Sequence, residues 1–85
     1  SMDDDMFIVY GRKSCPYCVM AVNSLTKKKL EHKFFDCEFD RDFLHEAKMF
    51  YNKSTVPIIL HIPSSTNIAR LVGGCDDLME FLSNA

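Results

Sequence analysis

The sequence lacks the features of several large protein classes. Among its 85 residues there are only three glycines and three prolines, and no tryptophan. Glycine and proline are too scarce for a fibrous or low-complexity chain, and a hydrophobic content of 47% is too high for intrinsic disorder. No apolar run reaches the roughly 18 residues that a membrane span requires. We therefore expect one small globular domain over residues 2–85, with the Ser1 that precedes Met2 set aside.

Neither sign of charge dominates the sequence. Ten basic residues against twelve acidic ones give a formal net charge of −2 at pH 7, which argues against nucleic acid as the main partner. Basic residues predominate from position 12 to 33 and acidic ones from 36 to 46, a distribution that we attribute to solvation of the surface. The first five residues are mostly acidic, unlike the basic and then apolar start of a secretory signal. We therefore expect a cytoplasmic protein with no membrane partner.

Four cysteines are present in this short chain. In a reducing compartment cysteines act as free thiols, metal ligands or redox groups more often than as a structural disulfide framework. A zinc site would require a second close pair of Cys or His ligands, but Cys37 and Cys75 lie far apart in the sequence and the three histidines are scattered. A redox role for the close pair Cys15 and Cys18 is therefore favoured over a zinc site.

The apolar residues alternate between the periods of strands and helices. Residues 6–10 form a short apolar run that ends at a glycine, which predicts a buried strand. A helix follows from Pro16, and lysines fill its last turn, where the helix dipole favours cations. Its apolar face carries three residues at helical spacing, Cys18, Val22 and Leu25. Apolar and acidic residues then alternate over residues 35–39, which predicts a second strand.

The second half of the chain ends in a hairpin and a short helix. A helix capped by Asp40 or Asp42 comes first. Its predicted apolar face carries Phe43, Ala47, Phe50 and Tyr51. The apolar, branched run of residues 56–62 predicts a strand that begins at Pro57, residues 63–67 are turn-forming, and residues 68–72 return as the hairpin partner. After two glycines, the apolar face of a last helix carries Leu78, Phe81 and Leu82.

The predicted element order is β-α-β-α-β-β-α, which belongs to the α/β class. Two early strands joined by a helix imply a parallel, right-handed crossover, and the late hairpin adds antiparallel neighbours. We therefore expect a four-stranded mixed sheet flanked by helices. No repeat or linker divides the chain.

The segment Cys15-Pro16-Tyr17-Cys18 lies where the first strand meets the first helix. A cysteine that attacks disulfides must be a thiolate, and the unpaired N–H groups and dipole of a helix start stabilise an anion at Cys15. Pro16 suits the first helical position because its missing N–H would have no partner there. Cys18 follows one turn later on the same face, so the two sulfurs can form a small disulfide. Position alone predicts an exposed nucleophile and a more buried second thiol.

Three motifs, in this order, resemble those of dithiol glutaredoxins. They are the Cys-Pro-Tyr-Cys segment after Gly11-Arg12, Thr55-Val56-Pro57 at the start of a strand, and Gly73-Gly74-Cys75-Asp76-Asp77 at the start of the last helix. The resemblance extends from Met6 to the C-terminus. It implies a thioredoxin fold and an enzyme that uses glutathione to reduce disulfides and protein–glutathione mixed disulfides.

The resemblance also implies roles for the matching residues near the two sulfurs. Cys15 would be the attacking thiolate that carries the glutathionyl intermediate, and Cys18 would be the resolving thiol. Tyr17 would line the glutathione groove. Thr55-Val56-Pro57 would form a cis-proline turn in which backbone groups of Val56 pair with the cysteinyl unit of glutathione like one more strand.

The remaining implied roles concern the two ends of glutathione and the partners. N–H groups at Cys75 and Asp76 would hold the γ-glutamyl carboxylate, and Asp77 would bind the amino group. Arg12 and Lys13 would bind the glycyl carboxylate or stabilise the thiolate. The resemblance thus implies glutathione as co-substrate and no tightly bound cofactor or metal. The protein would be a monomer that acts on disulfide-containing or glutathionylated proteins.

Several of these residues also have purely structural interpretations. Asp77 fits a capping box with the acidic residue three positions later, and Asp76 is a candidate N-cap. Cys37 and Cys75 are expected to be core residues rather than regulatory thiols. The sequence departs from the family pattern at Asp76, where Ser or Thr is common, and in a longer hairpin over 58–72.

Three hypotheses from different classes remain. The first is a glutathione-coupled thiol–disulfide oxidoreductase, and the second is an electron donor of the same fold that a thioredoxin reductase reduces. The third is a non-enzymatic module that shares an iron–sulfur cluster between two chains through Cys15 and glutathione. The Gly-Gly-Cys-Asp-Asp motif favours the first over the second. Pro16-Tyr17 disfavours the third because it keeps Cys18 near Cys15.

Overall fold

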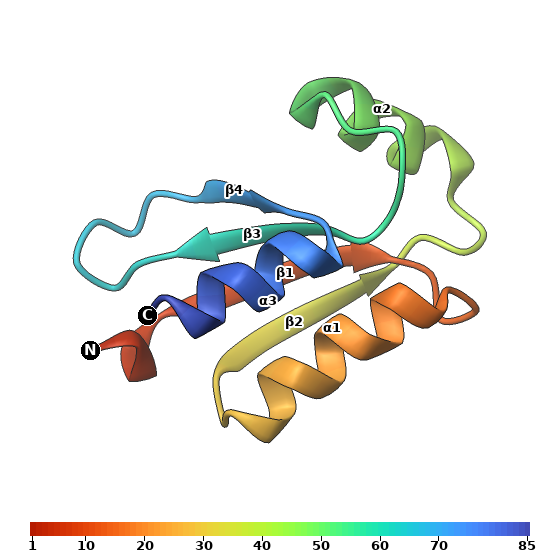
Figure 1. Cartoon of the computed structure of the whole chain (residues 1–85). Helices are drawn as coiled ribbons and strands as arrows, with labels where there is room; N and C mark the ends of the chain where they lie inside the picture. The colour runs from red at the N-terminus through yellow and green to blue at the C-terminus, as the bar shows by residue number, and fades with distance from the viewer.

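The computed structural model describes residues 1–85 and confirms the predicted order of strands and helices (Figure 1). The strands are β1 (Met6–Gly11), β2 (Glu31–Asp36), β3 (Ile58–Ile62) and β4 (Arg70–Gly73). The helices are α1 (Pro16–Lys27), α2 (Arg41–Tyr51) and α3 (Cys75–Ser83), preceded by a short 3-10 helix, η1 (Met2–Asp4), that the sequence pattern did not predict. None of these helices has the length and apolar composition needed to cross a membrane.

The sheet brings three chain segments together at one end. Its strand order is β2-β1-β3-β4, with β1 parallel to β2 and antiparallel to β3, and β3 antiparallel to β4. Gly11 at the end of β1 lies opposite Asp36 at the end of β2, and Tyr10 lies opposite Ile58 at the start of β3. The loops that follow β1 and β2 and the turn that precedes β3 therefore meet at the same end of the sheet. This is the mixed sheet of the predicted thioredoxin fold.

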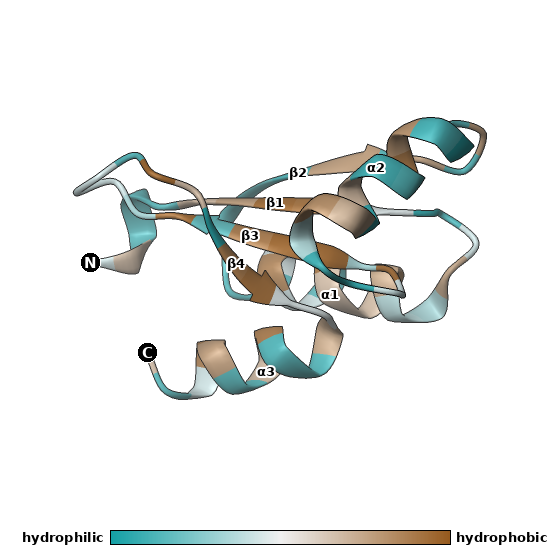
Figure 2. Cartoon of the chain, turned by 90° about the horizontal axis from the view of Figure 1, so that it is seen from above, coloured by the Kyte–Doolittle hydropathy of each residue, from teal (hydrophilic) through white to brown (hydrophobic).

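Helices cover both faces of the sheet, with α1 and α3 on one face and α2 on the other (Figure 2). The larger core cluster consists of Phe7, Val9, Ala21, Leu25, Leu30, Ile59, Cys75, Leu78 and Leu82. A smaller cluster joins α2 to the end of the sheet where the loops meet, and it consists of Cys18, Cys37, Leu44 and Val56. Burial of each large apolar side chain contributes about 1.5–3 kcal/mol to folding. Cys37 and Cys75 are confirmed as buried core residues.

The predicted bounds of the second strand, 35–39, were wrong. The strand is Glu31–Asp36, and it lies at the edge of the sheet, where its first polar residues can remain exposed. After this strand the Cys37 N–H donates a 2.7 Å hydrogen bond to the Gly11 carbonyl, and the chain then turns away from the sheet. Phe39, which was expected to lie in the strand, is 96% exposed. β3 begins one residue later than predicted, and β4 begins two residues later.

The second helix has the predicted cap but buries fewer side chains than its pattern indicated. Asp40, rather than Asp42, is the N-cap, and its carboxylate accepts a 3.2 Å hydrogen bond from the Phe43 N–H. Ala47 is buried as predicted, whereas Phe50 is 81% exposed. The apolar pattern overestimated burial because α2 packs only over one end of the sheet and much of its surface remains uncovered (Figure 1).

The N-terminal segment is joined to the β3–β4 hairpin by one buried carboxylate. Asp5 accepts hydrogen bonds from the Ser64 N–H at 2.9 Å and from His61 Nε2 at 2.7 Å. These two hydrogen bonds outweigh the effect of burial and lower the pKa of Asp5 from its ordinary value. The His61 ring also packs 4.9 Å from the rings of both Phe7 and Phe81. Asp5 thus connects the start of β1 with the hairpin and with α3.

Asp5→Asn should lower the stability of the fold most strongly near neutral pH. Because the pKa of Asp5 is lower in the folded than in the unfolded chain, ionised Asp5 stabilises the fold above the unfolded pKa, and this contribution is lost as pH falls through the folded pKa. The variant should have a lower urea midpoint than the wild type at pH 7. Below about pH 4 its midpoint should fall less steeply with pH than that of the wild type. Asp4→Asn, at an exposed carboxylate, is the control. Equal midpoints for Asp5→Asn and the wild type at pH 7 would refute this role.

Candidate functional site

Cys15 lies at the start of α1, where its sulfur caps the helix. It is the N-cap residue, and its Sγ accepts a 3.4 Å hydrogen bond from the Cys18 N–H. Pro16 occupies the first helical position, as predicted. Cys15 Sγ also lies 3.9 Å from the carbonyl oxygen of Val56, in the turn that precedes β3. The half-buried sulfur therefore lies between the helix start and this turn.

The surroundings of Cys15 favour its thiolate form. Burial alone would raise its pKa, but hydrogen bonds to the sulfur outweigh burial and lower the pKa from its ordinary value. The donors are the Cys18 thiol and the backbone N–H groups of Cys18 and Tyr17, and the positive charge of Arg12 acts in the same direction. A thiol with a lowered pKa and partial exposure has the properties of a nucleophile.

Cys18 has the opposite environment. It is only 1% exposed, which confirms that it is more buried than Cys15. Burial, reinforced by the hydrogen bond that its thiol makes to Cys15, raises the pKa of Cys18 to about 12. Its sulfur packs so closely on β1 that a Cβ added at Gly11 would lie 2.5 Å from it, and glycine is therefore required there. The pair thus combines a thiolate with a neighbouring protonated thiol, and both cysteines are free.

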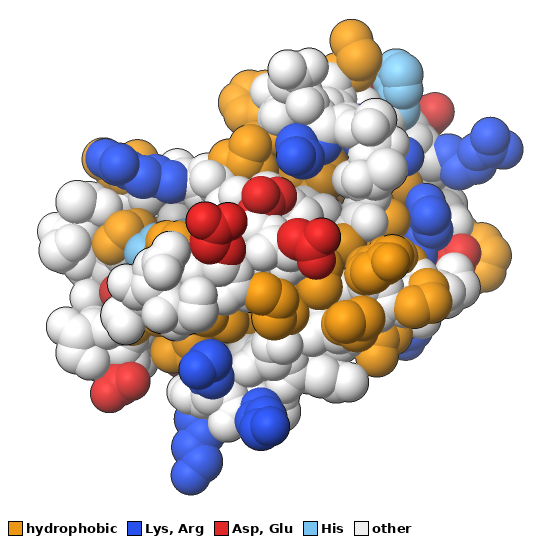
Figure 3. Space-filling model, viewed as in Figure 1, with side chains coloured by type: hydrophobic (Ala, Val, Ile, Leu, Met, Phe, Trp, Pro, Cys, Tyr) orange, Lys and Arg blue, Asp and Glu red, His pale blue; other side chains and the backbone are white.

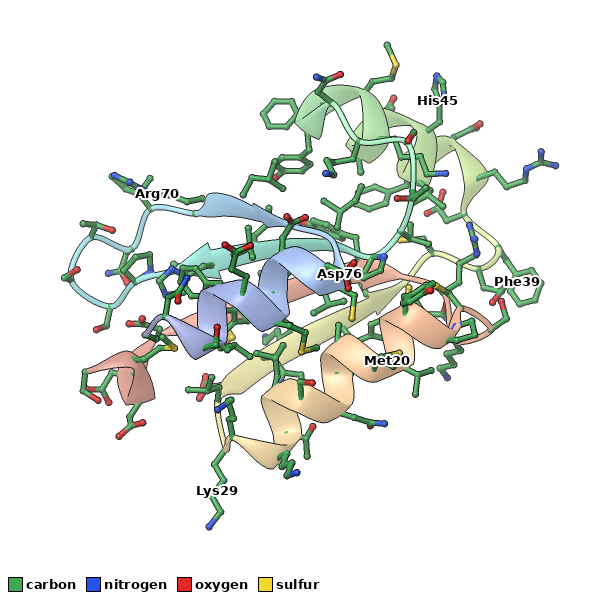
Figure 4. The ribbon with its side chains drawn as sticks, viewed as in Figure 1. Met20, Lys29, Phe39, His45, Arg70 and Asp76 are labelled. Atoms are coloured by element: carbon green, nitrogen blue, oxygen red, sulfur yellow. The ribbon has the colours of Figure 1, made fainter.

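A groove of about 230 Å³ opens beside this pair, between the starts of α1, β3 and α3. Its lining residues are Tyr17, Lys53, Thr55, Val56, Pro57, Gly74, Cys75, Asp76 and Asp77. The fold thus brings together residues from all three sequence motifs. The Val56–Pro57 peptide bond is cis, as the family resemblance implied. Tyr17 is 60% exposed, and Asp76 extends from the start of α3 (Figure 4).

The sequence prediction of this groove missed one cation and included two that lie elsewhere. Lys53 lines the groove, and its position two residues before Thr55 was the available signal. Arg12 and Lys13 do not line this groove, and together they line a different hollow beside α1. Arg12 nevertheless acts on the Cys15 sulfur through its charge. A contact of Arg12 or Lys13 with the glycyl carboxylate stays a prediction.

The start of α3 presents free backbone donors to the groove. Gly74 is the N-cap, so Asp76 is not the cap that the sequence indicated. The Asp77 carboxylate accepts a 2.8 Å hydrogen bond from the Gly74 N–H, which makes Asp77 the acidic partner of the cap. Because glycine has no side chain to cap the helix in return, the N–H groups of Cys75 and Asp76 have no acceptor in the chain. Free N–H groups at a helix start attract an anionic group.

Cys37 and Cys75 are less reactive than Cys15 because both are buried. Burial raises the pKa of both Cys37 and Cys75, so these thiols remain protonated near neutral pH. No group of three or more His, Cys, Asp or Glu side chains is arranged to hold a metal ion. Cys15 alone among the four cysteines has a lowered pKa. Thiolate chemistry is therefore concentrated at the start of α1.

Comparison with solved structures places this fold among glutaredoxins. The solution structure of a glutaredoxin from Brucella melitensis is 28% identical, with a TM-score of 0.69, over 93% of this chain and 79% of that one. The dithiolic glutaredoxin 2-C-Grx1 from Trypanosoma brucei brucei is 24% identical, with a TM-score of 0.73, over 98% and 82% of the two chains. A buckwheat glutaredoxin–glutathione complex is 19% identical, with a TM-score of 0.73, over 98% and 73%. The last two likenesses bear on the fold alone.

The family model of glutaredoxins matches residues 7–61, which include the Cys15–Cys18 segment and the turn at Pro57. No curated protein matches the chain. The match covers more than half of the chain and agrees with the fold and with the position of the thiol pair at the start of α1. The chain therefore belongs to the glutaredoxin family of thiol oxidoreductases.

Proposed function

We propose that this protein is a glutathione-dependent oxidoreductase that reduces disulfides and protein–glutathione mixed disulfides. The observation that carries the proposal is a single thiol of lowered pKa, Cys15, that lies 3.9 Å from the carbonyl oxygen of Val56. Val56 lines a groove whose polar groups suit a tripeptide with two carboxylates. Family membership supports the thiol chemistry, and the groove supports glutathione as the co-substrate.

The groove offers a complementary group to each part of glutathione. Val56 precedes β3, and no hydrogen bond among the turns and loops occupies its backbone N–H, which is free to pair with the cysteinyl unit. The free N–H groups at Cys75 and Asp76 suit the γ-glutamyl carboxylate. Asp77 keeps a second oxygen for the amino group, and Lys53 supplies a cation for the glycyl carboxylate.

Reduction of a glutathione mixed disulfide needs only Cys15. The Cys15 thiolate attacks the glutathione sulfur, the bond between glutathione and the target breaks, and the target leaves as a thiolate that takes a proton from solvent. A second glutathione thiolate then attacks the glutathione sulfur bound to Cys15. This step releases oxidised glutathione and restores the Cys15 thiolate. One free glutathione is consumed, and the other half of the oxidised glutathione comes from the mixed disulfide.

Reduction of a protein disulfide also uses Cys18. Attack by Cys15 leaves the target joined to Cys15, and Cys18 then attacks the Cys15 sulfur to release the reduced target and form the Cys15–Cys18 disulfide. Since the pKa of Cys18 is about 12, its proton must leave during this attack, and the departing target thiolate can accept it. Two glutathione molecules subsequently reduce the Cys15–Cys18 disulfide.

Cysteine substitutions should separate these two reactions. Cys15→Ser should abolish reduction of every substrate, because no other thiol has a lowered pKa. Cys18→Ser should retain substantial activity on a glutathionylated peptide while losing reduction of a protein disulfide. Activity is measured by NADPH consumption with glutathione and glutathione reductase, and in parallel with thioredoxin reductase. Turnover with thioredoxin reductase alone would contradict glutathione dependence.

The two sulfurs should also differ in their reaction with limiting iodoacetamide. The lowered pKa of Cys15 predicts that it is alkylated at lower pH than the other cysteines, whereas Cys18, with a pKa of about 12, stays unlabelled from about pH 4 to about pH 9. Arg12→Gln should move the onset of Cys15 labelling to higher pH because it removes a favourable charge. Mass spectrometry of the digested protein locates the label. Labelling of any other cysteine at a lower pH than Cys15 would overturn the assignment.

Asp76 should weaken glutathione binding by repulsion. Its carboxylate lies at the helix start that we assign to the γ-glutamyl carboxylate, a like-charge contact that costs about 1 kcal/mol at a partly exposed site. Asp76→Ser should therefore lower the KM for glutathione up to about fivefold, with a smaller effect at high salt. Glu80→Gln removes an acidic residue that lies outside the groove and should leave the KM unchanged. A KM that is unchanged or raised in Asp76→Ser would refute the repulsion.

A further inference from the structure

One face of the sheet is only partly covered by a helix. α2 lies over one end of this face and leaves the rest of its strands without a covering helix (Figure 2). Tyr10 of β1 points to this face, because its ring lies 5.6 Å from that of Phe43 in α2. Residues opposite each other on paired strands share a face, as do alternate residues of one strand. The same face therefore carries Ile8, Phe35, Leu60 and Leu71.

Two phenylalanines of α2 stand beside the open part of this face. The helix rests on its buried residues Leu44 and Ala47, and Phe43 and Phe50, seven residues apart, form a ridge along its side. Because Phe43 contacts Tyr10, the ridge borders the strands. Hydrophobic side chains are visible on the surface between α2 and β4 (Figure 3). The molecule thus presents this ridge next to a floor, which consists of the sheet residues Ile8, Phe35 and Leu71.

The ridge and the floor expose a large apolar area for so small a protein. Phe35, Phe43 and Leu71 are between 41% and 46% exposed, and Phe50 is 81% exposed. Because a fully covered aromatic side chain contributes about 150–250 Å², these residues together expose roughly 400 Å² of apolar surface. About 60% of an interface is apolar, so the patch corresponds to an interface of roughly 700 Å² per protein. A stable complex buries about 800 Å² per partner, which this surface nearly reaches.

Two unpaired charges of opposite sign accompany the ridge and the floor. Glu46 lies on the ridge side of α2, three residues after one phenylalanine and four before the other. Lys33 lies on the floor side of β2, since it is paired with Ile8 in the strand register. Both side chains are exposed, and neither takes part in an ion pair within the chain. Glu31 shares the face with Lys33, but at the end of β2 that is farthest from α2 (Figure 1).

We propose that two copies of this chain pair through this surface about a two-fold axis. In such a dimer both copies use the same surface, so each of its parts must meet a complement on the other copy. The ridge of each α2 covers the floor of the other sheet, and Glu46 of each copy approaches Lys33 of the other. Because this one surface holds both the ridge and the floor and both charges, a second copy supplies every complement at once. The dimer departs from the monomer that the family resemblance implied.

The proposed interface is separate from the glutathione groove. No residue of the ridge or the floor lines that groove, and neither Lys33 nor Glu46 does. The dimer therefore goes beyond the proposed function and does not depend on it.

Sedimentation equilibrium of the reduced protein across the micromolar range tests the dimer. A reducing agent and a chelator are present, so that neither a disulfide nor a metal cluster can join two chains. An interface of this area predicts a dissociation constant on the order of micromolar. Phe50→Ser should raise this constant at least about a hundredfold, because each dimer loses two buried phenylalanines. Phe39→Ser is the matched control, since it removes a phenylalanine that is exposed in the loop before α2, outside the ridge and the floor (Figure 4).

A charge exchange tests the two-fold arrangement itself. Lys33→Glu should raise the dissociation constant up to about tenfold at low salt, because it places like charges together at two symmetric contacts. The double variant Lys33→Glu/Glu46→Lys should restore the wild-type constant. Each variant should still reduce the mixed disulfide of glutathione and 2-mercaptoethanol, which shows that it is folded. The exchange keeps the test decisive if Phe50→Ser does not fold.

A wild-type protein that stays monomeric throughout the concentration range would overturn the proposal. So would a dimer that Phe50→Ser leaves intact, a dimer that Phe39→Ser weakens equally, or a double variant that does not regain the wild-type constant. None of these outcomes touches the proposed function, which fails if the wild type does not reduce the small substrate.

Discussion

The hydrogen bonds that converge on the Cys15 sulfur determine how the rest of this site works. The sulfur caps α1, so it receives donors from the Cys18 thiol and from backbone N–H groups that the helix leaves unpaired. These donors overcome the effect of burial on the pKa of Cys15, while burial and the hydrogen bond from its thiol to Cys15 raise the pKa of Cys18. One local arrangement therefore makes the Cys15 thiol a nucleophile and keeps the Cys18 thiol protonated. Gly11 is part of it, because a larger residue there would displace the Cys18 sulfur.

The sheet topology supplies the surroundings of this pair. With β1 parallel to β2 and antiparallel to β3, the loops after β1 and β2 and the turn at Pro57 must meet at one end of the sheet. The start of α3 then completes a groove on one side of the sulfurs, and the start of α2 completes another on the opposite side. The first groove combines free N–H groups with Lys53, and the second contains the cations Arg12, Arg41 and Lys48.

The sequence-based errors have a common physical origin. The alternation over 35–39 is a genuine strand pattern, but the hydrogen bond from Cys37 to Gly11 precedes a turn away from the sheet. The apolar pattern of α2 predicted a buried Phe50, yet only part of that helix packs on the sheet. In both cases a local periodicity is correct about the conformations that a segment can adopt. The periodicity contains no information about whether a neighbouring helix or strand covers the segment.

The sequence by itself determined the element order, the thiol pair at the start of α1 and the motifs that line the first groove. The element order and the thiol pair follow from local chemistry, namely the apolar period and proline at the first helical position. The motifs of the groove were identified through the resemblance to glutaredoxins. Only the tertiary structure decided that Lys53 joins that groove and that Arg12 and Lys13 lie outside it. It also decided that Arg12 meets Arg41 and Lys48 in a second groove. Such placements depend on how elements distant in sequence pack against each other, and charge composition alone does not encode them.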